Sequence, residues 1–381
     1  MNKTNWARMC LALLLLIFSF NVSAQKTFKN PILPGFHPDP SICRVENDYY
    51  MVTSSFEWFP GLPIFHSKDL VNWERIGHVL DRPSQLQMKD GLKASNGLWA
   101  PTIRYHQGTY YVICTATGCG GNFFVTADSP EGPYSEPIFI KDAPGIDPSL
   151  FFDEDGTMWY CGSINGDNKI PPRRYPAEDR IYVQQLDPST GQFIGERHIV
   201  SSGYAINSPY AEAPHIYKIK GKYYLMIAEG GTWENHAVSV FTADNIVGPY
   251  TPFICNPVLT HRHLGNDIDI TTIGHADLVQ TQNGDWYSVM LGVRPVNGFN
   301  MLGRETFLTP VEFQGEQAIF NPGVGRVLME EQFPKLPECP VIKPDNRDEF
   351  NGQSLAYCWN FLRTPFEKWY ELKDSKLQIN L

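Results

Sequence analysis

This 381-residue sequence has no long stretches with helical periodicity, and no apolar run of membrane length follows residue 24. Glycine and proline are frequent throughout, with short runs rich in Val, Ile, Tyr and Trp between them. Such runs, bounded by turn residues, are typical of strands. The sequence therefore predicts an all-β fold.

The number and spacing of the cysteines indicate neither a disulfide framework nor a zinc site. Without residues 1–24 the chain keeps seven cysteines, an odd and scattered set. Cys43, Cys114 and Cys161 fall in predicted strands, where we expect them to be small buried hydrophobes. Cys114 and Cys119 lack the second Cys or His pair that a zinc signature needs.

Positive charge is scarce as well. The chain has 31 Lys and Arg against 41 Asp and Glu, and losing Lys3 and Arg8 with residues 1–24 takes its net charge from −10 to −12. This balance argues against nucleic acid or an anionic membrane surface as a partner. A neutral substrate fits better.

The first 24 residues have the features of an export signal. Lys3 and Arg8 precede the apolar stretch Met9–Phe18, and Val22-Ser23-Ala24 is a small-residue cleavage site. The apolar stretch is too short for a stable membrane anchor, although an uncleaved anchor is the alternative. We therefore expect a secreted or periplasmic protein without a membrane span after signal removal.

Five strand-like segments recur along the chain, and the Pro or Ala that anchors each lies 47 to 66 residues after the last. They begin at Asp39-Pro40, Ala100-Pro101, Asp147-Pro148, Glu212-Ala213-Pro214 and His275-Ala276. Each runs through a turn into a second, aromatic-rich strand. A hairpin repeat of this length predicts a five-bladed β-propeller over residues 25–335. Equivalent positions of the blades should then meet at one axis.

A second echo supports this register, because residues 126–134 (TADSPEGPY) recur as residues 242–250 (TADNIVGPY) at the same place in their blades. After a Pro-rich connector near residue 335, residues 345–381 indicate the start of a further β unit, with strands at Asp348–Phe350 and Leu377–Leu381. About thirty-five residues cannot bury a core of their own. A fragment of a second domain and a tail packed on the propeller both remain open.

Three acids, Asp39, Asp147 and Glu212, stand at the starts of predicted innermost strands. A single Asp-Pro is usually a turn, but stability gives no reason to crowd three carboxylates at one mouth, where like charges repel. Calcium would need six to eight oxygens, and Asn266–Asp269 is only a modest candidate for supplying them. Paired carboxylates for glycoside hydrolysis explain the set more economically.

Aromatic and basic residues accompany these acids. Phe56 follows the second strand of the first blade and Trp99 precedes the second blade, where flat rings suit the apolar faces of sugars. Packing between blades is the alternative for either ring. His275 should point down the axis and contact substrate, water or a cation, or be a satisfied core residue. Arg304 could clamp a sugar or a carboxylate, or pair with Glu305.

Taken together, these motifs resemble glycoside hydrolase family 43, in its β-xylosidase and α-L-arabinofuranosidase branch. The resemblance covers residues 28 to about 330. Its motifs are residues 30–41 (NPILPGFHPDPS), 53–61 (TSSFEWFPG), 67–73 (SKDLVNW), 98–101 (LWAP), 145–150 (GIDPSL), 212–215 (EAPH), 274–276 (GHA) and 302–306 (LGRET).

The resemblance implies a five-bladed propeller that hydrolyses with inversion and requires no cofactor. Asp39 would be the general base, Glu212 the general acid and Asp147 the modulator of that acid. Phe56, Trp99, His275 and Arg304 would contact the substrate, and a structural calcium could lie in the central channel near His275. Relatives carry a complete C-terminal β-sandwich, of which residues 345–381 would be an incomplete start.

We therefore predict an exo-glycosidase that releases terminal β-1,4-linked D-xylose from small xylo-oligosaccharides, with α-L-arabinofuranosidase activity as the alternative. A fructan hydrolase would have Asn-Asp-Pro-Asn at the first blade and a Glu-Cys pair for the acid, whereas Asp39 follows His37-Pro38 and Glu212 precedes Ala213. A non-catalytic carbohydrate-binding propeller would need the aromatics but not the three acids.

Overall fold

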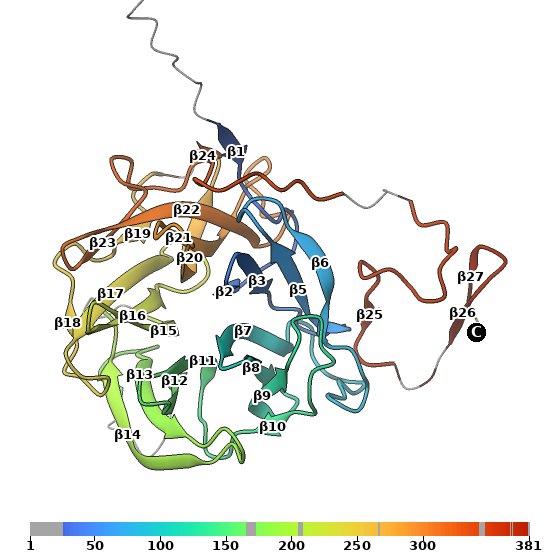
Figure 1. Cartoon of the computed structure of the whole chain (residues 1–381), viewed down its shortest axis with the longest axis horizontal. Coiled ribbons are helices and arrows are strands. Elements are labelled where there is room, and N and C mark those ends of the chain that lie inside the picture. The colour runs from blue at the N-terminus through green and yellow to red at the C-terminus, as the bar shows by residue number, and fades with distance from the viewer. Residues whose placement is uncertain are drawn as a thin grey trace, which may run out of the picture.

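Five antiparallel sheets stand around a common axis in the computed structural model of this chain (Figure 1). The structure describes residues 26–164, 173–204, 209–265, 267–342, 347–365, 367 and 369–379. The predicted signal at residues 1–24 lies outside them. No helix of the described residues is long and apolar enough to cross a membrane.

Each sheet is one blade, and its four main strands follow one another along the chain apart from the inserted β4. Blades one and two are β2 (Ser41–Val45), β3 (Asp48–Val52), β5 (Gly61–Ser67) and β6 (Glu74–Leu80), then β7 (Gly97–His106), β8 (Thr109–Thr117), β9 (Gly121–Ala127) and β10 (Ile138–Phe139). Blade three is β11 (Ile146–Phe152), β12 (Met158–Ile164), β13 (Arg180–Leu186) and β14 (Phe193–Ser201). Blade four is β15 (Glu212–Ile219), β16 (Lys222–Glu229), β17 (Ala237–Ala243) and β18 (Thr251–Pro252), with β19 (Leu259–Thr260) also on β17. Blade five is β20 (Thr271–Gln280), β21 (Trp286–Val293), β22 (Glu305–Gln314) and β23 (Gln317–Phe320).

The five first strands, β2, β7, β11, β15 and β20, form the inner ring, and each contacts the next around it (Figure 1). The structure therefore confirms the five-bladed propeller that the spacing predicts. Because the starts of all five strands reach the axis, residues hundreds of positions apart become neighbours.

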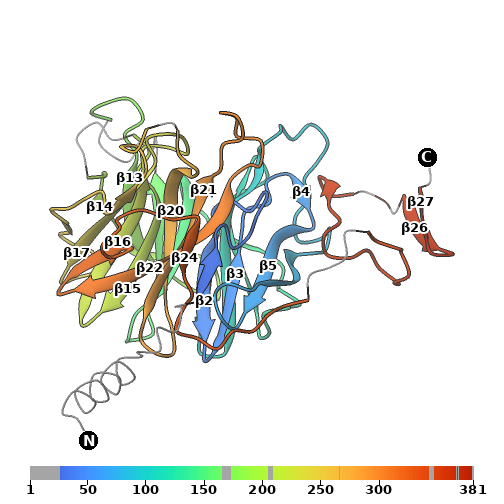
Figure 2. The same ribbon diagram turned by 90° about the horizontal axis from the view of Figure 1, so that it is seen from above.

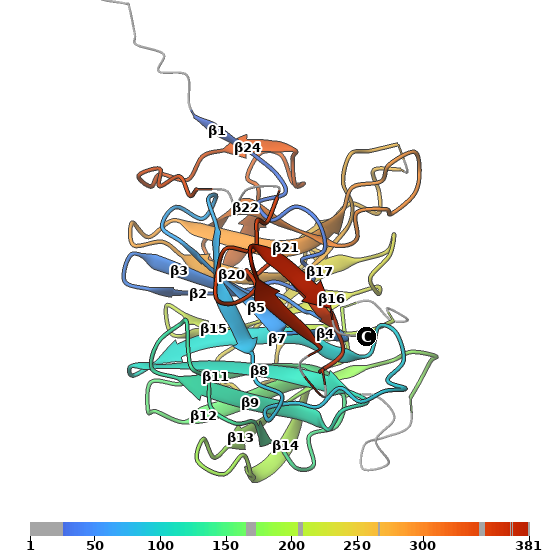
Figure 3. The same ribbon diagram turned by 90° about the vertical axis from the view of Figure 1, so that its right-hand side faces the viewer.

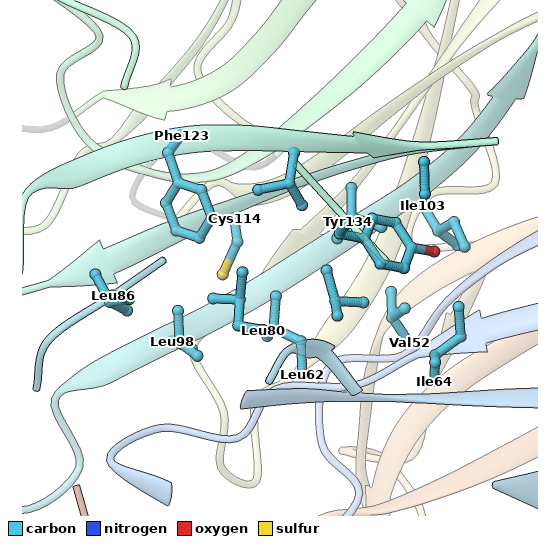
Figure 4. Close-up of a cluster of buried hydrophobic side chains, with 14 of the residues drawn as sticks. Val52, Leu62, Ile64, Leu80, Leu86, Leu98, Ile103, Cys114, Phe123 and Tyr134 are labelled. Atoms are coloured by element: carbon cyan, nitrogen blue, oxygen red, sulfur yellow. The ribbon is translucent and has the colours of Figure 1, made fainter. Parts of the chain in front are cut away.

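Apolar side chains from facing blades fill the spaces between them. Five buried clusters are present, one for each pair of adjacent blades. Figure 4 shows the cluster of blades one and two, where Val52 and Leu62 of the first face Ile103 and Phe123 of the second. A strand with a neighbour on both faces becomes buried on both, as in β16, where all residues after Lys222 are buried. Cys43, Cys114 and Cys161 are buried free thiols, as predicted.

The ring closes through the N-terminal segment and not through a shared strand. β1 (Thr27–Lys29) pairs with β24 (Glu330–Gln332), which follows blade five. Asn30 is buried and its side chain bonds both backbone groups of Leu308 and the carbonyl of Leu328. Blade one is thereby held against blade five.

The C-terminal segment leaves blade five, passes blade one and ends beside it (Figures 2 and 3). β25 (Phe361–Leu362) pairs with β4 (Trp58–Phe59) of blade one, and β26 (Tyr370–Lys373) forms a hairpin with β27 (Lys376–Ile379). The strand predicted at Leu377–Leu381 is present as far as Ile379, and Asn380 and Leu381 lie outside the described residues. The one predicted at Asp348–Phe350 is wrong, because Phe350 packs on the Trp359 ring and Asp348 accepts a hydrogen bond from its indole.

Candidate active site

An unusual backbone conformation recurs at the same place in all five blades, at the mouth of the inner ring. Asp39, Ala100, Asp147, Ala213 and His275 all have φ between +45° and +55°, a region that side chains with a Cβ adopt only under strain. Each directly precedes the anchoring Pro or Ala of its blade. In four of the blades the pairing with the second strand shifts register at this point. Such bulges re-aim side chains, and here they turn the strand starts toward the axis.

The three acids do not share one register position. Asp39 and Asp147 occupy the strained position itself, as does His275. Glu212 lies one residue earlier, next to Ala213, and Trp99 has the same offset from Ala100. The prediction that all three acids are equivalent is therefore corrected by one residue for Glu212.

The seven residues predicted for the site line one cavity of about 350 Å³. They are Asp39, Phe56, Trp99, Asp147, Glu212, His275 and Arg304. A larger groove of about 760 Å³ lies between blades four and five. It is lined by Lys218 and Gln280, at the opposite ends of β15 and β20, and holds none of the three acids.

Asp39 is buried among groups that favour its ionised form. One oxygen accepts hydrogen bonds from Arg304 Nη1 at 2.6 Å and lies 3.8 Å from His275 Nδ1, while the other accepts from Ser54 Oγ at 2.6 Å. Burial alone would raise the pKa of Asp39, but Arg304, His275 and Ser54 together hold it below the ordinary value. A carboxylate in this state can accept a proton.

Glu212 has the opposite surroundings. Burial first, and then the charges of Asp147, Asp179 and Asp39, raise its pKa well above the ordinary value. Asp147 lies close by, since its Oδ2 accepts the N–H of Ala213 at 3.2 Å. Burial also raises the pKa of Asp147 to about 6. Glu212 is thus the carboxyl of the three best suited to carry a proton at neutral pH.

Aromatic rings wall one side of the cavity. The rings of Phe56 and Trp99 lie 6.1 Å apart, and the Arg304 guanidinium lies 5.4 Å from the centre of Phe56. Arg304 therefore bridges Phe56 and Asp39. Its alternative partner, Glu305, is instead held by Arg294 through bonds of 2.6 and 2.8 Å.

Ser54, Tyr210 and His236 also belong to the site and were missed by the sequence patterns. Tyr210 and His236 line the cavity, and Ser54 bonds Asp39. None of them stands at the start of an inner strand. The repeat therefore gave no signal for them, and in particular His236 stands before the third strand of blade four.

The central channel below the site is where a structural calcium near His275 is predicted. Asp277, two residues after His275, is the buried acid there, and its oxygens accept bonds from Arg104, Ser41 and Tyr217. Calcium prefers six to eight oxygen ligands. The described residues contain no cluster of three or more His, Cys, Asp or Glu that could hold a metal. A structural calcium in this channel stays a prediction.

This chain matches a family model and is similar to known proteins in sequence and structure. The family model described as Glycosyl hydrolases family 43 matches residues 28–318. A xylosidase/arabinosidase of Butyrivibrio fibrisolvens is 47% identical over 91% of this chain and 67% of its own length. A non-reducing end α-L-arabinofuranosidase of Bacteroides ovatus is 43% identical over 98% of this chain and 68% of its own. The crystal structure of a xylan β-1,4-xylosidase from Bacillus halodurans superposes with a TM-score of 0.86 at 38% identity, covering 92% of this chain and 68% of that one.

Proposed function

Since this chain belongs to glycosyl hydrolase family 43 and is a glycoside hydrolase, we propose that it removes terminal β-1,4-linked D-xylose from xylo-oligosaccharides with inversion. The observation that carries the reaction type is the contrast between two buried carboxyls in one cavity. Arg304 and His275 hold the pKa of Asp39 below its ordinary value, while burial and then its acidic neighbours raise the pKa of Glu212 well above its ordinary value.

In the proposed mechanism Asp39 takes a proton from a water molecule as that water attacks the anomeric carbon. The bond from this carbon to the leaving oxygen breaks, and Glu212 gives its proton to that oxygen. Asp147 keeps Glu212 protonated until this step by charge repulsion. All proton transfers use side chains of the chain itself, and no cofactor takes part.

Phe56 and Trp99 would stack on the apolar face of the terminal sugar, and the short cavity would admit one sugar at the chain end. The cavity volume of about 350 Å³ is at the small end for a ligand site and supports exo action. Arg304 would orient both Asp39 and the sugar.

Release of terminal α-L-arabinofuranose is the second candidate. The relatives at 47% and 43% identity both carry arabinose in their names, whereas the crystal structure at 38% is of a xylosidase. The two sugars present similar hydroxyl patterns, so the shape of the pocket must distinguish them.

Initial rates on the nitrophenyl β-D-xylopyranoside and α-L-arabinofuranoside test the substrate. We expect the xyloside to be cleaved faster, and a much higher rate on the arabinofuranoside would reverse the order. NMR of the first-formed sugar tests the reaction, because an inverting enzyme releases the opposite anomer. Inverting enzymes have their two carboxyls roughly 6.5–9.5 Å apart, which leaves room for the attacking water. A retained anomer would remove Asp39 from the role of base.

The variant Asp39→Ala separates an enzyme from a sugar-binding propeller. An enzyme should lose turnover and keep most of its sugar affinity, whereas a binding protein has no turnover to lose.

Secretion or periplasmic location is a further proposal, supported by the composition of residues 1–24. An exported protein that begins at Gln25 by N-terminal sequencing would agree with it.

A further inference from the structure

His236 lines the cavity but has no part in the mechanism proposed above. It directly precedes β17, comes from outside the ring of strand starts, and is only 2% exposed. A buried imidazole beside a ligand cavity needs a reason, because burial of a polar ring without partners is unfavourable.

Three hydrogen bonds fix this residue. Its N–H donates to Trp233 O at 3.0 Å, its carbonyl accepts from Thr260 Oγ1 at 2.8 Å, and its Nδ1 lies 3.0 Å from Thr272 O. A carbonyl oxygen can only accept, so Nδ1 carries the ring proton. Burial lowers the pKa of His236 to about 3, which keeps the ring neutral. Nε2 is then a bare acceptor.

The surrounding packing directs this acceptor. A Cβ on Gly274 would come within 2.4–2.5 Å of the His236 ring, so the glycine makes room for the imidazole. No protein group among the described residues bonds Nε2. Nε2 is also not among their fully buried polar atoms that lack a partner. It therefore opens onto the cavity that the ring lines.

We propose that His236 Nε2 accepts a hydrogen bond from one hydroxyl of the terminal sugar and thereby helps to determine specificity. This inference rests on the proposed function. Asp39 is already engaged by Arg304 and Ser54, and Glu212 is a donor when protonated. A fixed, neutral acceptor selects a hydroxyl at that position and discriminates against a sugar that lacks it.

Two variants of the full chain separate the two ring nitrogens. In His236→Asn the amide nitrogen can replace Nδ1 and keep the bond to Thr272, but no acceptor remains at the place of Nε2. In His236→Gln the longer amide can put an oxygen near the place of Nε2. We expect His236→Asn to lose about 10- to 100-fold in kcat/KM on the parent nitrophenyl glycoside, and His236→Gln to lose less.

The decisive measurement repeats the kcat/KM comparison of wild type and variants with the 2-, 3- and 4-deoxy analogues of the glycoside. On the one analogue that lacks the recognised hydroxyl, wild type and His236→Asn should differ by less than about threefold, as in a double-mutant cycle. Thermal unfolding checks that both variants fold. If His236→Asn does not, Gly274→Ala displaces the ring by packing and should give the same dependence on the analogue.

Equal losses on the parent and on all analogues would mean that His236 is only structural, and the proposal would be wrong. No loss on any substrate would also overturn it. Wild-type chain that cleaves neither parent glycoside would instead refute the proposed function, and this inference with it.

Discussion

Asp39 and Glu212 are both buried carboxyls, and their neighbours give them opposite protonation states. Arg304, His275 and Ser54 surround Asp39, whereas the charges nearest Glu212 are those of other acids. Groups whose environments push their pKa values apart are the usual basis of acid and base assignments. The direction of proton transfer thus follows from the immediate neighbours of each side chain.

Ser54 is predicted to position and tune the base. Its Oγ accepts the N–H of Ala100 at 2.7 Å and donates its own proton to Asp39 at 2.6 Å. In Ser54→Ala the pKa of Asp39 should rise, because a bond to its ionised form is lost. We expect the acidic limb of the kcat/KM profile to move up by roughly 0.5–1 pH unit and the maximum to fall about 3- to 10-fold.

The neighbouring Thr53 provides a matched control. Its hydroxyl is buried and has no hydrogen-bond partner among the described residues. Thr53→Val should therefore leave the pH profile where it is. A profile that moves equally in both variants would show that Ser54 acts only through packing.

Asp147 is predicted to set the alkaline limb. Activity needs protonated Glu212 and is lost as the pH rises through its raised pKa. Asp147→Asn keeps an oxygen for Ala213 N–H but removes the negative charge, so the pKa of Glu212 should fall. We expect the alkaline limb to move down by about one unit, measured as kcat/KM against pH.

A graded comparison strengthens this test. Asp179 also raises the pKa of Glu212, but less than Asp147 does. Asp179→Asn should therefore shift the same limb in the same direction by a smaller amount. An unchanged limb in Asp147→Asn would remove this acid from the role of modulator.

At the scale of elements, the inner strands were the most predictable part of the structure. Asp39-Pro40 and Asp147-Pro148 recur at blade spacing, and the structure puts both at the mouth of the ring. Because β11 and β15 have the same bulge, the one-residue offset of Glu212 is already present in the sequence, where Asp147 lies one residue before Pro148 and Glu212 two residues before Pro214. The bulge itself is not part of the spacing pattern.

The remaining site residues depend on contacts between strands and between blades. Ser54 reaches Asp39 because β3 pairs with β2 in blade one, and Ala100 of blade two bonds the Ser54 hydroxyl. His236 reaches the cavity because Thr272 of blade five anchors its ring. The strand expected at Asp348–Phe350 is replaced by packing between Phe350 and Trp359. Tertiary contacts decide these features, and a local pattern does not contain them.

The segment that closes the ring gives a prediction for stability. Asn30→Ala would leave the N–H of Leu308 and two carbonyls without their partners. We expect the free energy of unfolding to fall by about 2–3 kcal/mol, measured by urea denaturation. Activity at low temperature should be retained, since Asn30 is not part of the cavity.

Thr27, on the same segment, is the control. Its hydroxyl bonds the exposed Glu330 at 2.5 Å, and an exposed bond of this kind contributes little. Thr27→Val should cost less than about 1 kcal/mol. If both variants were equally destabilised, the side chain of Asn30 would not be what closes the ring.

At the scale of the whole molecule, the C-terminal segment lies against the propeller (Figure 3), where β25 pairs with β4, two residues after Phe56 of the cavity. Arg363 N–H donates to Glu57 O at 2.7 Å, next to Phe56, and its guanidinium bonds Leu92 O. Ser95, on the same loop as Leu92, accepts the indole N–H of Trp99 at 2.7 Å. The C-terminal segment is therefore a brace, because it bonds the loops next to Phe56 and Trp99, the two aromatic residues of the cavity.

Thr364 is the buried contact of this brace, and its loss should change substrate binding more than chemistry. Its Oγ1 accepts Met88 N–H at 3.0 Å and donates to Leu86 O at 2.9 Å. In Thr364→Val both bonds are lost, and we expect KM to rise about 3- to 10-fold on the nitrophenyl glycoside. The value of kcat should change less than about twofold, because the inner strands and not the brace place the acids. Lys376→Ala, in the exposed hairpin of the same segment, is the control and should change neither KM nor kcat. A fall in kcat alone for Thr364→Val would show that the brace acts on the acids instead.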